Sequence, residues 1–252
     1  MMRPLLLCFF VFTVFFSCKE AGPATKKCNT PSGRYLNSTV LKSCPDKMPY
    51  DVPNYCYELK FNGKDSVAID NGFENYTLPF AATANECEFV IPEGSAEGDM
   101  LFRATSDSTL ELIDTAWTKV PSASFFSKVN IPDRKDWGFT EFLNECIIAG
   151  EYALFTDGEL QPNQATFFIN GQLNGMKPYI GYNLCYAGDC VGETEPPSRI
   201  IEFVDRDGKA EAFSFKNVEG KMAIEIYSIG EGNPEIKGER PIGKLKYELR
   251  TE

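Results

Sequence analysis

Six Asn-Gly or Asp-Gly dipeptides divide this sequence into short segments, and they constrain its fold more than any other feature. Such pairs favour the type I′ turn, which joins neighbouring antiparallel strands. Helical periodicity is nearly absent between them, and several segments alternate apolar and polar residues, as a strand with one buried face does. The pattern predicts a meander of antiparallel hairpins and not parallel strands joined by helices. The six pairs are Asn62-Gly63, Asn71-Gly72, Asp157-Gly158, Asn170-Gly171, Asn174-Gly175 and Asp207-Gly208.

The two halves of the chain share an order of features. A cysteine precedes Gly33-Arg34-Tyr35 in the first half, and another precedes Gly150-Glu151-Tyr152 in the second. A strand-turn-strand segment follows in each half, around Asn62-Gly63 or Asp207-Gly208, and an alternating strand ends each half. A repeat of about 100 residues is a sensible size for a small β domain. The alternative is that the correspondence is accidental and the chain forms one large sandwich.

The sequence therefore predicts an all-β fold, with two tandem small antiparallel β-barrel or β-sandwich domains. The expected linker contains a proline and a charged cluster, and residues 140–144 within it are expected to form one short helical turn. The expected boundaries are a signal peptide at 1–17, a tether at 18–27, a first β domain at 28–126, a linker at 127–145 and a second β domain at 146–252.

The first seventeen residues have the pattern of an export signal. Arg3 precedes the apolar run 5–16, which is too short to span about 30 Å of hydrocarbon as a helix. The run ends at Ser17-Cys18, which resembles the signal of bacterial lipoproteins, where a small residue precedes a cysteine that is lipidated. The resemblance implies a lipid anchor on Cys18 that holds the protein at the outer membrane of the cell envelope. The alternative is an ordinary secretory signal, cut near Ala21 or Ala24, and a secreted protein.

Nine cysteines occur, and this number in an exported chain favours disulfide bonds over metal ligands. The sequence leaves their connectivity open, and a local bridge between Cys185 and Cys190, which enclose a turn, is one possibility. Cys44 and Cys56 flank a Pro-containing loop that a bridge between them would close. With Cys8 in the signal and Cys18 assigned to lipid, the candidates for disulfides are Cys28, Cys44, Cys56, Cys87, Cys146, Cys185 and Cys190, an odd count that leaves one free thiol or an intermolecular bridge.

Composition excludes several kinds of chemistry. There is no histidine, which removes histidine-dependent nucleophiles and His-ligated zinc. A net charge of −11 argues against nucleic acid as a partner, because phosphate binding needs an excess of Lys and Arg. Glu86 and Glu88 form a carboxylate pair of the kind that cleaves glycans, although 36 acidic residues make such pairs common. Trp117 and Trp137 could stack on sugar rings, although packing is the more common use of tryptophan. No cofactor, metal site or catalytic residue is assigned.

An exported β domain that opens with Gly-x-Tyr and continues as hairpins resembles the lipocalin-type barrels of bacterial lipoproteins at the level of fold. The resemblance implies a closed barrel that encloses an apolar lumen. The expected function is a non-enzymatic, lipid-anchored binding protein of the cell envelope, which takes a small apolar ligand in a barrel lumen or binds another envelope protein. Two alternatives remain, a secreted hydrolase that uses carboxylates to act on glycans and a structural or adhesive surface module.

Overall fold

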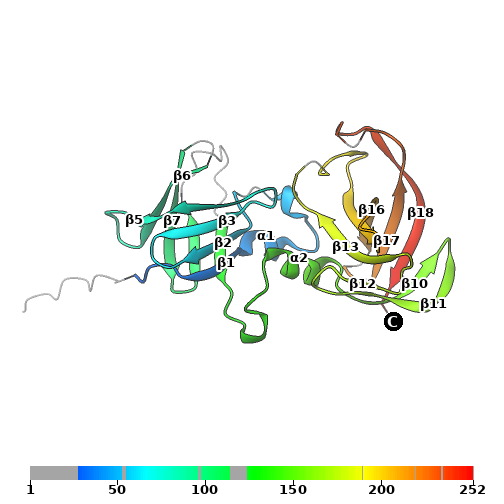
Figure 1. Cartoon of the computed structure of the whole chain (residues 1–252), viewed down its shortest axis with the longest axis horizontal. Helices are drawn as coiled ribbons and strands as arrows, with labels where there is room; N and C mark the ends of the chain where they lie inside the picture. Colours follow the sequence, from blue (N-terminus) through cyan, green and yellow to red (C-terminus); the bar gives the residue numbers. More distant parts are fainter. Residues whose placement is uncertain are drawn as a thin grey trace, which may run out of the picture.

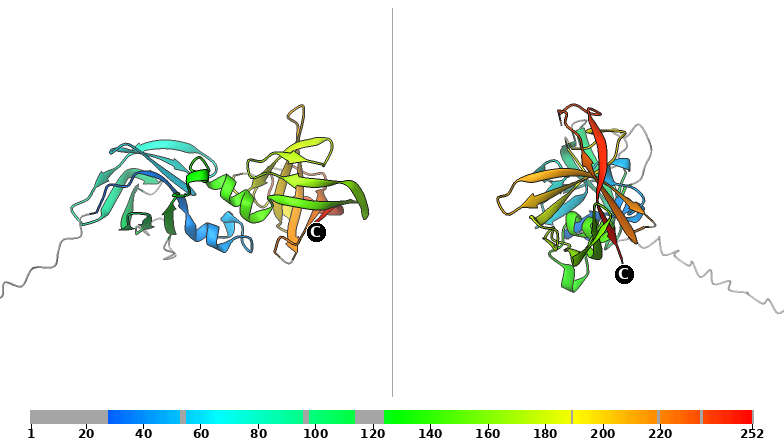
Figure 2. Two further views of the ribbon diagram at one scale, coloured as in Figure 1. Left: turned by 90° about the horizontal axis from the view of Figure 1, so that it is seen from below. Right: turned by 90° about the vertical axis from the view of Figure 1, so that its right-hand side faces the viewer.

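The computed structural model in Figure 1 has two β-sheet bodies side by side, with two helices between them. The structure describes residues 28–251, apart from 53–54, 96–97, 114–123, 189, 219 and 234. Both sheets are meanders of antiparallel strands, so the expected all-β fold is confirmed. Figure 2 (left) shows the green helix α2 (Phe139–Ile147) running between the two sheets.

Nine strands form the first sheet, in the order β4-β3-β2-β1-β9-β8-β7-β6-β5. Among the described residues, β4 and β6 share no ladder of backbone hydrogen bonds, although the Tyr76 hydroxyl donates across the gap to the Gly94 carbonyl (3.4 Å). The first sheet is therefore curved but not closed by backbone pairing. The strands are β1 (Gly33–Asn37), β2 (Glu58–Asn62), β3 (Ser66–Asp70), β4 (Asn75–Pro79), β5 (Ala81–Ala82), β6 (Glu88–Ser95), β7 (Gly98–Ser106), β8 (Thr109–Leu112) and β9 (Ser124–Lys128).

The second sheet nearly closes into a barrel, because β10 pairs both with the strand after it and with the last strand, β18. A bridge between Gln172 and Gly181 links the remaining two ends, next to β12 and in β13. A short strand outside this ring, β14 (Thr194–Glu195), pairs in parallel with the start of β18. The strands of the ring are β10 (Gly150–Thr156), β11 (Glu159–Phe167), β12 (Leu173–Asn174), β13 (Tyr179–Cys185), β15 (Arg199–Asp205), β16 (Ala210–Val218), β17 (Ala223–Ile229) and β18 (Arg240–Arg250).

Helices occupy the space between the sheets. Helix α1 (Ser38–Ser43) starts directly after β1, and its N-cap Asn37 accepts a hydrogen bond from Val40 N (3.1 Å). Helix α2 replaces the single turn expected at 140–144, and Glu141 accepts from the Gly138 amide (2.8 Å) at its start. Two 3-10 turns complete the connections, η1 (Pro49–Asp51) and η2 (Pro132–Arg134).

The two halves share a hydrophobic core across these helices. Val40 of α1 and Tyr57 belong to the same cluster of buried residues as the interior of the second barrel. The Tyr57 ring stacks on Phe139 of α2, with ring centroids 4.7 Å apart. A disulfide bond between Cys44 and Cys146 joins the end of α1 to α2. Packing and a covalent bond therefore hold the first half against the second.

Candidate functional site

Six of the seven candidate cysteines form the disulfide bonds Cys28–Cys87, Cys44–Cys146 and Cys185–Cys190. The local bridge between Cys185 and Cys190, one of the pairings that the sequence left open, is present. The other pairing considered from the sequence, Cys44 with Cys56, does not form, because Cys44 lies at the end of α1 against α2 and bonds to Cys146 there. Cys56 is a free thiol in the core, and burial raises its pKa well above the usual range, so it behaves as a small apolar side chain.

Two residues singled out by the sequence, Cys18 and Trp117, lie outside the described residues, as does the tether at 18–27. Trp137 is described. Its ring contacts Phe142 of α2 (centroids 5.2 Å apart), and the Arg134 guanidinium lies 4.5 Å from the ring centroid. Trp137 therefore covers the linker helix, and one of its faces is taken by a cation.

The carboxylate pair of the glycan-hydrolase alternative does not have the environment of an acid–base pair. Glu88 lies 2.7 Å from the Arg103 guanidinium and accepts from Asn85 (2.7 Å), and these bonds lower its pKa. A carboxylic acid that protonates a leaving group needs a raised pKa instead. Glu86 is exposed. Across the described ranges, no group of three or more Cys, Asp or Glu side chains is arranged to hold a metal ion.

The interior of the second barrel, where the sequence places a ligand lumen, is filled with side chains. Phe167 packs against Tyr182 and Phe203, with ring centroids 5.1 and 6.2 Å away. An eight-stranded barrel is just wide enough for side chains to fill its centre. The inward-facing residues are each at most 3% exposed: Tyr152, Phe167, Tyr182, Ile201, Phe203, Phe213, Phe215, Ile224, Ile226 and Leu249.

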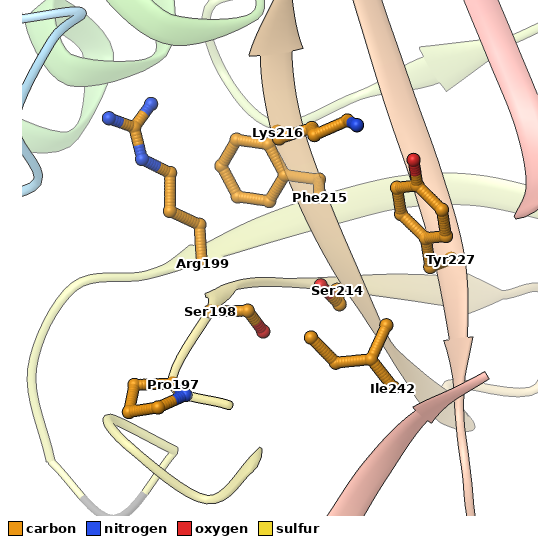
Figure 3. A pocket seen from close by; sticks show the side chains of 8 residues that line it. All are labelled: Pro197, Ser198, Arg199, Ser214, Phe215, Lys216, Tyr227 and Ile242. Carbon is orange, nitrogen blue, oxygen red and sulfur yellow. The ribbon is translucent and has the colours of Figure 1, made fainter. Parts of the chain in front are cut away.

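A cavity of about 350 Å³ lies instead on the outer face of this barrel, and Figure 3 shows its lining. The chain between β13 and β15 builds it by folding back over the strands. The Cys185–Cys190 disulfide turns the chain, Thr194 of β14 pairs with Arg240 of β18, and Pro197 then forms one wall. The volume is at the lower end of the range for small-molecule sites, about 300–1,000 Å³. The lining residues are Pro197, Ser198, Arg199, Ser214, Phe215, Lys216, Tyr227 and Ile242.

Ser214 lies on the floor of this outer cavity. It is on β16, opposite Ile200 of β15 and Tyr227 of β17, and it is only 3% exposed. Its neighbours Phe213 and Phe215 point into the barrel, so alternation along the strand turns Ser214 outward. Its hydroxyl makes no hydrogen bond to the described residues, and its oxygen reaches the cavity, because the one enclosed side-chain polar atom without a partner in the described part of the chain is Asn144 Oδ1. In Figure 3 it lies between Ser198, Ile242 and the Tyr227 ring.

The charged side chains at the rim are already paired. The Lys216 ammonium lies 2.6 Å from Glu225 and 5.3 Å from the centre of the Tyr227 ring, and the Tyr227 hydroxyl also donates to Glu225. Hydrogen bonds to Glu225 and Tyr227 raise the pKa of Lys216 above its ordinary value. Lys216 therefore stays protonated and is no base for the hydroxyl of Ser214, which a serine nucleophile would need.

Arg199, on the opposite side of the cavity, is paired as well. One guanidinium nitrogen donates to the Asn217 side chain (3.0 Å) and another donates to the Asp46 carbonyl in the first half (2.6 Å). In Figure 3 its charged end points away from Ser214. The arrangement can therefore bind a small molecule in apolar surroundings next to a free hydroxyl, and none of the described side chains that line it is an activated nucleophile.

Sequence reasoning missed this site for a physical reason. Ser214 occupies a polar position of an alternating strand, which predicts a solvent-facing residue. Only the 193–198 segment, whose place depends on the pairing of β14 with the distant β18, covers it. The one local signal is the pair Pro196-Pro197 shortly after a closely spaced cysteine pair.

No protein-family model, curated protein or solved structure matches this chain. Within the described part of the chain, no helix has the length and apolar character needed to cross a bilayer. The functional inference below therefore depends on the outer cavity and on the N-terminal sequence.

Proposed function

We propose that this protein is an exported, non-enzymatic binding protein that holds a small apolar molecule in the outer cavity. The observation that carries the proposal is the Ser214 hydroxyl, which opens into the floor of a largely apolar cavity and makes no hydrogen bond to the described residues. A hydroxyl that faces a cavity and is not bonded to the protein can donate to and accept from a ligand or water that occupies the cavity. The paired Lys216 supports binding over turnover, because it supplies no base.

The proposal moves the ligand from the barrel lumen to the outer face. Entry into the lumen would require displacement of Phe167, Tyr182 or Phe203, each of which packs against other rings. Deletion of a buried aromatic ring lowers the free energy of unfolding by about 3–5 kcal/mol, which indicates how unfavourable it is to move such a ring out of the core. The outer cavity needs no such rearrangement.

We test the binding site with two tryptophan variants on β18. Ile242→Trp fills the cavity, whereas Leu245→Trp adds the same ring at a position that is 38% exposed and outside the lining. The mature chain is mixed with a membrane lipid extract, purified again, and analysed for bound small molecules by mass spectrometry. We expect the wild type and Leu245→Trp to retain one set of apolar molecules and Ile242→Trp to lose it. Retention by Ile242→Trp, or no ligand on the wild type, would contradict the proposal.

The same proposal includes a lipid anchor on Cys18 at the outer membrane. It is supported by the leader of residues 1–17, and several acyl chains on one residue would give stable membrane attachment where one chain gives only marginal binding. Cells fed an alkyne-labelled fatty acid should incorporate it into the wild type and into Cys8→Ala, but not into Cys18→Ala. Labelling that persists in Cys18→Ala, or is absent from the wild type, would support the secreted alternative.

A further inference from the structure

The hydroxyls in and next to the outer cavity differ in how many of their hydrogen-bond donors and acceptors are already used within the protein. Thr194 donates its hydroxyl hydrogen to the Pro196 carbonyl (3.1 Å), so its contact with Ser198 (2.9 Å) uses the hydrogen of Ser198. Ser214 makes no such bond among the described residues, and both its donor and its acceptor remain open. Of the hydroxyls that line the cavity, Ser198 donates to Thr194 and Tyr227 donates to Glu225, so Ser214 is the one whose hydrogen is not used within the described protein.

The remaining lining favours a neutral molecule. The walls next to Ser214 are Pro197, Ile242 and the ring of Tyr227, which cannot solvate a charge. Two cations are in the lining. Lys216 is paired with Glu225, which an anionic ligand would have to displace, and Arg199 donates to Asn217 and to the Asp46 carbonyl with its charged end turned away from Ser214. Burial of an ion among such walls costs far more than burial of a carbonyl or a hydroxyl that finds a partner.

We propose that the outer cavity takes neutral, apolar molecules that carry one hydrogen-bonding oxygen, such as a ketone, an ester or an alcohol, and that Ser214 determines this specificity. The inference rests on the proposed function and names its ligand class. A hydrocarbon that fills the cavity leaves the Ser214 hydroxyl unpaired, whereas a carbonyl oxygen accepts its hydrogen. A site built to pair with a ligand oxygen discriminates strongly against the analogue that lacks it, because the polar group of the protein is then left without a partner.

Two probes of nearly the same shape test this. Cyclohexanone and methylenecyclohexane differ in the replacement of a carbonyl oxygen by a methylene group. Each is titrated into the mature chain, and dissociation constants are taken from the NMR shifts of the Ile200, Ser214 and Tyr227 amides. We expect the wild type to bind the ketone about tenfold more tightly, the effect of one hydrogen bond to a buried hydroxyl. Ser214→Ala should remove that preference.

Ser198→Ala is the matched control, because it deletes a hydroxyl of the same cavity that is already bonded to Thr194. It should keep the preference of the wild type within about twofold. Equal binding of both probes to the wild type, or a preference that survives in Ser214→Ala, would overturn the specificity and leave the binding site intact. Binding of neither probe, with no ligand from the lipid extract, would overturn the proposed function itself.

Discussion

Both halves of the chain bring a tyrosine of their first strand against a phenylalanine of their second. Tyr35 meets Phe61 edge-on with ring centroids 5.6 Å apart, and Tyr152 meets Phe167 in the same way at 6.0 Å. In each half, the glycine two residues before the tyrosine pairs with that same phenylalanine across the strands. The first strand of each half also pairs with the last, β1 with β9 and β10 with β18. The two sheets are therefore built to one plan.

The two sheets differ in how their ends are joined. The second sheet joins its end strands through the bridge between Gln172 and Gly181, whereas β4 and β6 of the first are linked by the side chain of Tyr76. The second half also carries an added layer, residues 193–198, outside its strands. The candidate ligand site lies under that layer and not inside either sheet. The strand pairing that the two halves share therefore builds the two sheets, whereas the cavity depends on residues 193–198, which belong to the second half alone.

The largest expected effect distinguishes the disulfide between the halves from the one within the second half. Cys44 and Cys146 are separated by 102 positions in sequence, and Cys185 and Cys190 by 5. In the chain-entropy model a loop of about 100 residues gives about 4.7 kcal/mol of stabilisation, and a loop of a few residues about 2 kcal/mol. Paired Ser substitutions should therefore lower the free energy of unfolding by about 4–5 kcal/mol at the first bridge and about 2 kcal/mol at the second.

Urea unfolding of the two double-Ser variants, followed by circular dichroism, measures these losses. The variant without Cys185–Cys190 is the control for removal of a bridge that does not join the halves. Equal losses in the two variants would contradict the claim that Cys44–Cys146 constrains the two halves against each other.

A second prediction compares hairpin turns in the two halves. Gly175 follows β12 with φ +86°, and a Cβ there would lie 1.9 Å from the Gln164 carbonyl oxygen. Gly63 has φ +76°, and a Cβ there would meet nothing within 4 Å. Gly63→Ala should lower the free energy of unfolding by about 1–2 kcal/mol, because alanine is strained in the left-handed conformation. Gly175→Ala adds a steric clash with the backbone and should lower it by about 2–5 kcal/mol in all. Thermal unfolding of both variants tests this, and a smaller loss at Gly175 would show that the second barrel closes less tightly than described.

The sequence predicted the features that short-range chemistry determines. All six Asn-Gly and Asp-Gly pairs connect consecutive strands, and all six glycines have positive φ angles. Type I′ also requires a positive φ at the first residue of the pair, which only Asp157 has (50°), so the turn type was correctly predicted at Asp157-Gly158 alone. The sequence also suggested the bridge between Cys185 and Cys190, because only four residues separate these cysteines. The boundaries expected for the two domains and the anchor at Cys18 stay predictions.

Features that depend on distant contacts were missed. Helix α1 has no apolar periodicity, and its N-cap Asn37 belongs to an Asn-Ser-Thr glycosylation pattern in the sequence. In the fold Asn37 is fully buried and donates to the Cys56 carbonyl (3.0 Å), so it cannot carry a glycan. The pairing of Cys44 with Cys146 follows from the packing of α1 on α2, which no local pattern encodes. The cavity over Ser214 was missed for the same reason.

The smallest expected effect is a pH dependence of opposite sign at two glutamates. Glu58 of β2 accepts from the Phe139 amide of α2 (3.1 Å) and pairs with Arg34 (2.9 Å), and burial raises its pKa despite these partners. Glu225 of the second barrel is more exposed, and hydrogen bonds from Lys216 and then Tyr227 lower its pKa.

A raised pKa of an acid means that the unfolded chain releases the proton first, so the contribution of Glu58 is complete below its ordinary pKa of 4.5 and falls as pH rises through the folded value. The contribution of Glu225 is present above 4.5 and is lost as pH falls. The stability of the wild type relative to Glu58→Gln should therefore decrease from pH 4 to pH 7, and relative to Glu225→Gln it should increase, each by less than about 1 kcal/mol. Urea unfolding at the two pH values measures both differences. A shift of the same sign in both variants would mean that the contact between the halves titrates like an ordinary surface ion pair and is not a buried part of one core.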